Sequence, residues 1–196
     1  MELSLQALSA TDRSLPSECA SDDDLVARAA HDRSAFAELY QRHYRAIGSY
    51  LFRRTGDHHA TEELLSDVFF AALRGLRRYR ARGLSLRAWL YRIATNEANR
   101  WARRRRRRRR LYSLEDVVVE VPDRGDASPT ATGGFARLHS ALWSLPVRHQ
   151  AVVALFYLEE LSVEEIAQVL ATRVGTVKSR LARARETLRE KLRGRA

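Results

Sequence analysis

The chain has 196 residues and a formal net charge of +11 at neutral pH, which indicates a polyanionic partner such as nucleic acid. Its single cysteine, Cys19, excludes an internal disulfide and a zinc site built on cysteine pairs. No apolar run approaches the roughly 20 residues that span a bilayer, and the N-terminus lacks a secretory signal pattern. We therefore expect a cytoplasmic protein without direct membrane insertion.

The first part of the chain predicts two helices after a loose N-terminal segment, residues 1–20. Ser21 precedes three aspartates and is typical of a helix N-cap, so a short helix should run to about Ala30. A second helix should begin near Arg33 and end at Gly56, because glycine is common just after a helix.

A third helix is predicted from about His58 to Arg78. Its apolar residues recur at helical spacing and should face a core: Leu64, Leu65, Val68, Phe69, Ala72, Leu73 and Leu76. Glu62, Glu63, Ser66 and Asp67 fall on the outer side. Two histidines precede these acids, but no further ligand spacing supports a metal site.

The stretch from Leu86 to Arg110 predicts a fourth helix with two faces. Residues at three- and four-residue steps form a stripe that can pack inward: Trp89, Leu90, Ile93, Ala94, Glu97 and Trp101. Arg92, Asn96, Asn99, Arg100 and Arg103 fall largely on the remaining surface. Guanidinium groups bind phosphates and carboxamides pair with base edges. Eight consecutive arginines, 103–110, end the helix, and although a solvated surface helix with an arginine tail is the alternative, we interpret it as a nucleic-acid helix.

The remaining chain predicts an acidic linker, residues 113–134, and a second helical domain, residues 135–196. Helices are expected over 135–144, over about 148–158 and from Ser162, whose spacing to Glu165 fits a capping box. A short turn at 171–173 leads into a basic helix with Val177, Leu181, Ala184 and Leu188 inward. This arrangement is typical of a helix-turn-helix, although an ordinary helical hairpin has a similar pattern. The fold class is thus all-α: two small helical domains, 21–112 and 135–196, joined by an extended linker.

Three motifs together resemble the extracytoplasmic-function (ECF) sigma factors of the sigma-70 family, which direct RNA polymerase to promoters. They are ATEELLSDVFFAAL, LRAWLYRIATNEANRWARRRR and LSVEEIAQVLATRVGTVKSRLARARETLREKL, in that order. The resemblance covers about Ser21 to Leu192. It implies that the first domain binds polymerase and melts the −10 promoter element, and that the second reads the −35 element as duplex.

The resemblance also implies site residues. Polymerase would be bound by Glu63, Ser66, Asp67 and Phe70. The −10 strand would be bound by Tyr79, Arg80, Arg82, Trp89, Asn96, Asn99, Arg100, Arg103 and Arg104. The −35 duplex would be bound by Thr176, Lys178, Ser179, Ala182 and Arg183. The family usually has glutamine in place of Ser66, often tryptophan in place of Leu73, and commonly glycine in place of Ala171.

The implied partners are core RNA polymerase, promoter DNA and a separate anti-sigma factor, with no cofactor, metal or small-molecule substrate. A linker of this length spans about 75 Å when extended but averages about 26 Å as a coil. Two turns of DNA cover about 70 Å. The linker must therefore be nearly stretched when both elements are bound, or the domains must face each other.

Two other function classes would need features that the sequence lacks. A helix-turn-helix regulator that is not a polymerase subunit would need a receiver or ligand domain, and residues 21–110 show no period-two strand pattern. A nucleic-acid enzyme would need catalytic motifs such as HExxH or a phosphate-binding glycine loop, and the sequence has neither. We therefore expect a non-enzymatic initiation factor.

Overall fold

The computed structural model describes residues 20–29, 31–79, 83–112 and 140–193, and these residues form helices joined by turns and short loops. The helices are α1 (Asp22–Ala29), α2 (Arg33–Thr55), α3 (His58–Leu76), α4 (Leu86–Tyr112), α6 (Val147–Tyr157), α7 (Val163–Val169) and α8 (Val174–Arg193). The all-α fold is confirmed. The predicted linker, 113–134, and the N-terminal segment, 1–19, lie outside the described residues. So does the first half of the helix expected over 135–144, whereas residues 140–144 are helical.

Local capping explains where several helices begin and end. Asp32 and Asp57 accept hydrogen bonds from the first-turn amides of α2 and α3. Gly56 ends α2 in the left-handed region at φ 63°. Glycine adopts this conformation without a steric penalty because it has no side chain. The predicted capping box is present at α7, where Ser162 and Glu165 bond each other's backbone amides.

Helices α2, α3 and α4 pack together as the first unit, residues 22–112, with α1 against α2. The predicted inward face of α3 is correct except at Leu73, which is 45% exposed. Along α4, Leu90 and Ala94 are buried as predicted, and Trp89, Ile93 and Trp101 are half-buried and pack against the core. Glu97 is also half-buried, and Tyr91 and Ala98, which the predicted stripe did not include, lie in the core. The buried arc of α4 is therefore rotated and widened relative to the prediction.

Helices α6, α7 and α8 form the helix-turn-helix unit, residues 140–193. Val177, Leu181 and Ala184 are buried as predicted, and Leu188 packs beside them. The turn between α7 and α8 places Ala171 at φ 47°, the left-handed conformation in which this family commonly has glycine. Alanine thus makes the turn at some conformational cost.

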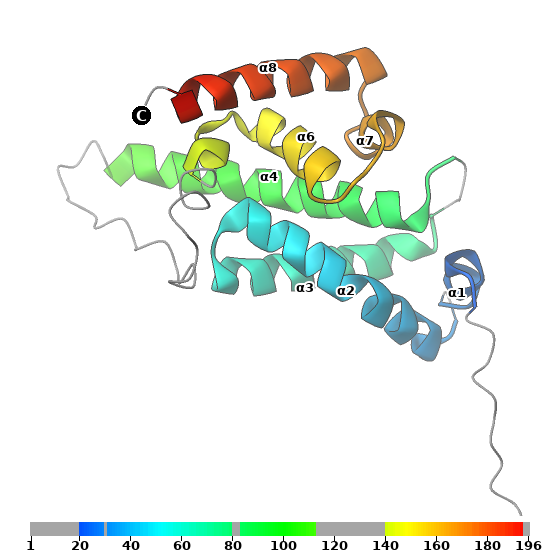
Figure 1. Cartoon of the computed structure of the whole chain (residues 1–196). Coiled ribbons are helices and arrows are strands. Elements are labelled where there is room, and N and C mark those ends of the chain that lie inside the picture. The colour runs from blue at the N-terminus through cyan, green and yellow to red at the C-terminus, as the bar shows by residue number, and fades with distance from the viewer. Residues whose placement is uncertain (1–19, 30, 80–82, 113–139, 194–196) are drawn as a thin grey trace, which may run out of the picture.

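The two units pack against each other. Helix α7 contacts α4, and α6 contacts both α2 and α4. In Figure 1, α6 and α7 lie between α4 and the outermost helix α8. Buried residues of both units belong to one continuous hydrophobic cluster, which includes Leu51, Tyr91, Leu155 and Ile166. The helix-turn-helix unit therefore covers a side of α4 that the sequence pattern of α4 alone does not identify.

Candidate polymerase and nucleic-acid interfaces

The outer face of α3 carries the four predicted polymerase-binding residues. Glu63, Ser66, Asp67 and Phe70 are all exposed, and the Phe70 ring is 61% exposed. The guanidinium of Arg74 lies 5.7 Å from the centre of that ring. The acidic side chains form a row along α3, and this row ends in an apolar patch made by Phe70 and the exposed Leu73. Such a combination suits a protein partner with basic and apolar side chains.

The start of α4 holds the aromatic residues of the predicted −10 site. The rings of Tyr79 and Trp89 lie 5.0 Å apart, and Trp89 is half-buried against Gly75. The Tyr79 hydroxyl donates to the carbonyl of Leu84 over 2.8 Å, which ties together the ends of the intervening loop. Burial and nearby acids of α1 raise the pKa of Tyr79. Arg80 and Arg82 lie outside the described residues.

Further along α4, Asn99 and Asn96 have different surroundings. Asn99 is half-buried, and its Oδ1 accepts from Nη2 of the buried Arg54 over 2.9 Å. Nη1 of Arg54 donates to the Tyr50 hydroxyl, which in turn bonds Thr95. Asn96 is exposed. Asn99 is therefore part of an internal polar network, whereas Asn96 is available at the surface.

The arginine run is helical, since α4 continues to Tyr112. Arg103, Arg104, Arg107 and Arg108 are exposed. Arg100, also exposed, pairs with Glu97 over 2.7 Å, and the Arg105 guanidinium lies 5.0 Å from the Trp101 ring centre. The rise of about 1.5 Å per residue spreads the run over about 12 Å, a length that crosses several phosphates of a nucleic-acid strand.

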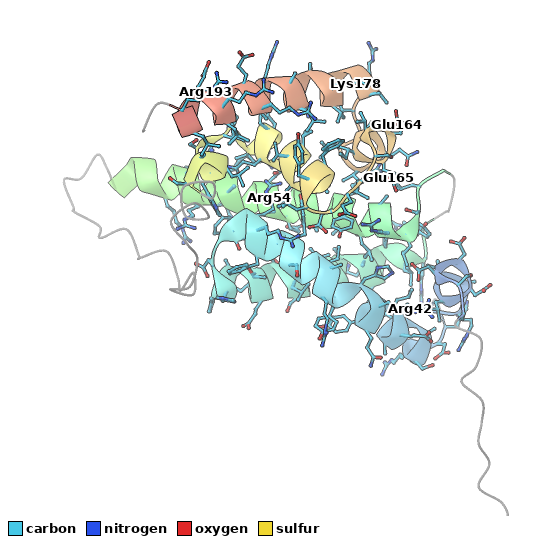
Figure 2. All side chains as sticks on the ribbon, viewed as in Figure 1. Arg42, Arg54, Glu164, Glu165, Lys178 and Arg193 are labelled. Carbon is cyan, nitrogen blue, oxygen red and sulfur yellow. The ribbon has the colours of Figure 1, made fainter. Side chains whose placement is uncertain are left out.

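The outer face of α8 carries the predicted −35 residues. Lys178, Ser179, Ala182 and Arg183 are exposed and Thr176 is half-buried. Lys178 projects from the outer side of α8, away from the other helices (Figure 2). Within the described part of the chain, the side chains of Lys178 and Arg183 have no hydrogen bond or ion pair. A partner could therefore contact these two side chains without breaking a bond within the described residues.

The basic side chains of α8 also affect the pKa of His149 of α6, which lies behind that helix. The side chain is buried, and its Nδ1 has no hydrogen-bond partner among the described residues. Burial, followed by the positive charges of Arg148, Arg180 and Arg183, lowers the pKa of His149. Burial and this charge thus favour the neutral form of the imidazole.

The structure also identifies residues that the sequence-based site did not include. Arg92 of α4 donates to the Gln168 carbonyl at the end of α7. Glu159, in the turn between α6 and α7, is buried and bonds Arg53 and Tyr91 of the first unit. Arg92 shares helical spacing with Asn96 and Arg103, so the periodicity could have identified it. Glu159 gives no comparable signal, because its surroundings come from the other unit.

Within the described residues, none of the helices is long and apolar enough to cross a membrane. Over the same residues, no group of three or more histidine, cysteine or acidic side chains is placed to hold a metal ion.

Comparison with protein families gives two matches along the chain. Residues 39–108 match the family model of sigma-70 region 2, and residues 135–188 match that of sigma-70 region 4. The first match covers most of α2 and all of α3, and it runs through most of α4. The second covers α6 and α7 and most of α8.

Individual proteins are similar over most of the chain. The RNA polymerase sigma factor YlaC of Bacillus subtilis is 33% identical over 82% of this chain and 93% of its own. The ECF RNA polymerase sigma factor SigM of Mycobacterium tuberculosis is 34% identical over 84% of this chain and 80% of its own. Among solved structures, CnrH in complex with the cytosolic domain of CnrY superposes with a TM-score of 0.66 at 28% identity. That superposition covers 89% of this chain and 99% of CnrH.

Proposed function

We propose that this chain, which belongs to the sigma-70 family of RNA polymerase sigma factors, binds core polymerase through α3, the −10 element through α4 and the −35 element through α8. As a sigma factor it directs promoter-specific transcription, and we assign it no chemical step of its own. The observation that carries the assignment is the separation of three exposed faces: one acidic and apolar, two basic. Each face has the chemistry of a different partner.

The polymerase contact is assigned to the acidic row and apolar patch of α3. Because Asp67 is exposed on that row, reversing its charge should leave the free energy of unfolding unchanged. Asp67→Arg should therefore weaken binding to core polymerase while leaving the thermal unfolding curve unchanged. Glu190→Arg, which reverses an exposed acid of α8, is the control. Equal polymerase binding by wild type and Asp67→Arg would contradict the assignment.

The −10 contact is assigned to α4, with sequence read by its amides and strand affinity supplied by its arginines. Melting exposes base edges that are hidden in the duplex, and aromatic rings such as Trp89 offer stacking surfaces for them. Each phosphate neutralised on a single strand contributes about −0.7 to the salt slope of binding, and about −0.9 on duplex.

Replacing Arg103, Arg104, Arg107 and Arg108 by glutamine tests this division. The slope of log affinity against log salt should flatten by about 3, given four single-strand phosphate contacts at about 0.7 each. The set of promoters chosen should stay the same. A changed promoter set with an unchanged slope would mean that the run reads sequence.

Regulation is assigned to a separate anti-sigma factor, and the cytoplasm is the proposed location. The similar chain CnrH was solved in complex with the cytosolic domain of CnrY, which supports a protein partner for this chain as well. The described residues contain no helix able to cross a membrane and no metal cluster that could act as a sensor. Purification from resting cells should recover a stoichiometric second protein. Recovery of polymerase without one would contradict this part of the proposal.

A further inference from the structure

We propose that the buried carboxylate of Glu159 is the latch that holds the helix-turn-helix unit against the first unit in the unbound protein, and that this latch must release before both promoter elements can be bound. The closure concerns contacts within this chain and does not depend on the proposed function. The consequence for promoter binding does rest on that function.

Three donors from the first unit converge on the turn between α6 and α7. The Glu159 side chain is 6% exposed, and its Oε1 accepts from Arg53 of α2 over 2.8 Å. Its Oε2 accepts from the Tyr91 hydroxyl of α4, and its backbone carbonyl accepts from Arg87 of α4 over 2.8 Å. A buried carboxylate is stable only where donors replace its lost water. Here all of these donors belong to the first unit, so they, rather than water, satisfy Glu159 when the units are closed.

The backbone around Glu159 holds the side chain toward that interface. Glu160 has φ 55°, a conformation that residues with a side chain seldom adopt, and its own side chain is exposed. On either side, Glu159 and Leu161 donate backbone hydrogen bonds to Ala154 and Leu155 of α6. Leu161 is buried in the shared core. The turn therefore keeps a strained residue in place while directing one carboxylate inward and the next outward.

Further contacts extend the closure along α4. Arg92 donates to the Gln168 carbonyl at the end of α7, and Arg106 donates to the Leu145 carbonyl over 3.4 Å. Arg92 lies on the same helical stripe as Asn96, Asn99 and Arg103. Packing is also tight elsewhere, since the cavity between Arg53, Arg54 and the α6 region is only about 20 Å³, about the volume that one water needs. The closed units thus cover one edge of the proposed −10 face.

The closed form also places the two reading helices too close together. Helix α8 packs on α6 and α7, and these pack on α4. Packed helices lie about 8–10 Å apart, so two such layers separate the axes of α4 and α8 by about 20 Å. Two turns of promoter DNA span about 70 Å. The units must therefore part before α4 and α8 can occupy both elements at once.

Energy transfer between two dyes in the full-length chain tests the closure. Gln41 of α2 and Glu186 of α8 are exposed and lie in different units, so Gln41→Cys and Glu186→Cys, with Cys19→Ser, give one label in each. The labelled chain should show high transfer alone and low transfer with polymerase and promoter DNA. Low transfer in the labelled chain alone would overturn the proposal without any further variant.

The latch itself is tested by Glu159→Gln, with Glu160→Gln as the matched control. Loss of the buried charge should lower the transfer of the free chain, while the exposed neighbour should leave it unchanged. Arg53→Gln is a second variant, because it removes the charged donor to Oε1 of Glu159 from an exposed side chain. High transfer in both variants would overturn the role of Glu159.

Promoter binding distinguishes the closure itself from its effect on function. If the closed form outweighs the open form about ten to one, Glu159→Gln should raise the apparent affinity for polymerase and promoter about tenfold. Opening without any gain in affinity would show that closure does not restrain binding, and would overturn that half of the proposal. Latch-dependent closure in a chain that binds no polymerase at all would leave the latch standing and contradict the proposed function instead.

Discussion

The two proposed DNA-reading helices differ in how far their polar side chains are already engaged. On α8, Lys178 and Arg183 are exposed and unpaired within the described part of the chain. On α4, Asn99 is bonded by Arg54, Arg100 by Glu97, and Arg92 donates to α7. A duplex element can therefore be read by α8 as it stands, whereas α4 must exchange internal bonds for bonds to a strand.

The difference fits the two forms of the DNA. A duplex groove presents its pattern of donors and acceptors before the protein arrives, so a preformed helix face suffices. A melted strand becomes available only after base pairs are broken. The contrast between α4 and α8 thus predicts a difference in function that can be tested residue by residue.

The largest expected effect is on duplex binding by α8. Arg183→Ala should lower affinity for −35 duplex by about 1–3 kcal/mol, roughly 5- to 150-fold, if the guanidinium contacts a base edge. The thermal midpoint should stay unchanged because the side chain has no internal partner. Binding can be measured by fluorescence anisotropy with a labelled duplex. Glu186→Ala is the control on the same helix, and a stability loss in Arg183→Ala would contradict the view of α8 as preformed.

On α4 the comparison predicts a stability effect instead. Asn99→Ala would leave the buried Arg54 without one of its acceptors, and hydrogen bonds to charged groups contribute about 1.5–3 kcal/mol. Chemical denaturation should therefore show a loss of about 1–2 kcal/mol, allowing for relaxation and for the partial exposure of Asn99. Asn99→Asp, which keeps the acceptor, should retain stability.

Asn96→Ala is the matched control, because Asn96 is exposed on the same face. It should leave unfolding unchanged while altering preference at the −10 element. Equal stability of Asn99→Ala and Asn96→Ala would mean that the Arg54 contact contributes nothing. The side chains of α4 would then be as available as those of α8.

Sequence periodicity predicted the outer faces of α3 and α8 well, because each follows from one helix and its immediate neighbours. It failed at Leu73, whose apolar side chain lies at the edge of the exposed α3 face rather than in the core. It also did not identify Tyr91 and Ala98 as core residues, and the Tyr91 side chain packs against Tyr50 of α2 and bonds Glu159 of the second unit. Glu159 was not predictable either. A glutamate in a turn is ordinarily exposed, and only the packing of distant helices shows otherwise.

A smaller effect is expected at the turn that orients α8. Ala171 has φ 47°, and the left-handed conformation costs a residue with a side chain about 1 kcal/mol or more. Ala171→Gly should therefore raise the free energy of unfolding of the helix-turn-helix unit, by somewhat less than about 1 kcal/mol because glycine also gains entropy when unfolded. Thermal unfolding and −35 binding should be measured together. A destabilised variant would show that the Ala171 methyl group makes contacts that outweigh the strain.

The smallest expected effect links the basic face of α8 to pH. The pKa of His149 is lowered by burial and then by Arg148, Arg180 and Arg183, so the folded unit binds a proton less readily than the unfolded chain, whose histidine has a pKa near 6.5. The associated stability is fully present above about pH 6.5. It is lost as pH falls below that value, because the unfolded state then takes up more protons.

His149→Gln should remove this part of the pH dependence. Thermal midpoints measured from pH 7.5 down to 5.5 should converge for wild type and variant, because wild type alone carries the histidine term. His31→Gln, an exposed histidine of the other unit, should leave the wild-type profile intact. Duplex DNA should weaken the dependence, since phosphates near Arg183 offset the charge that opposes protonation of His149. Parallel profiles for wild type and His149→Gln would mean that protonation of His149 is not linked to unfolding.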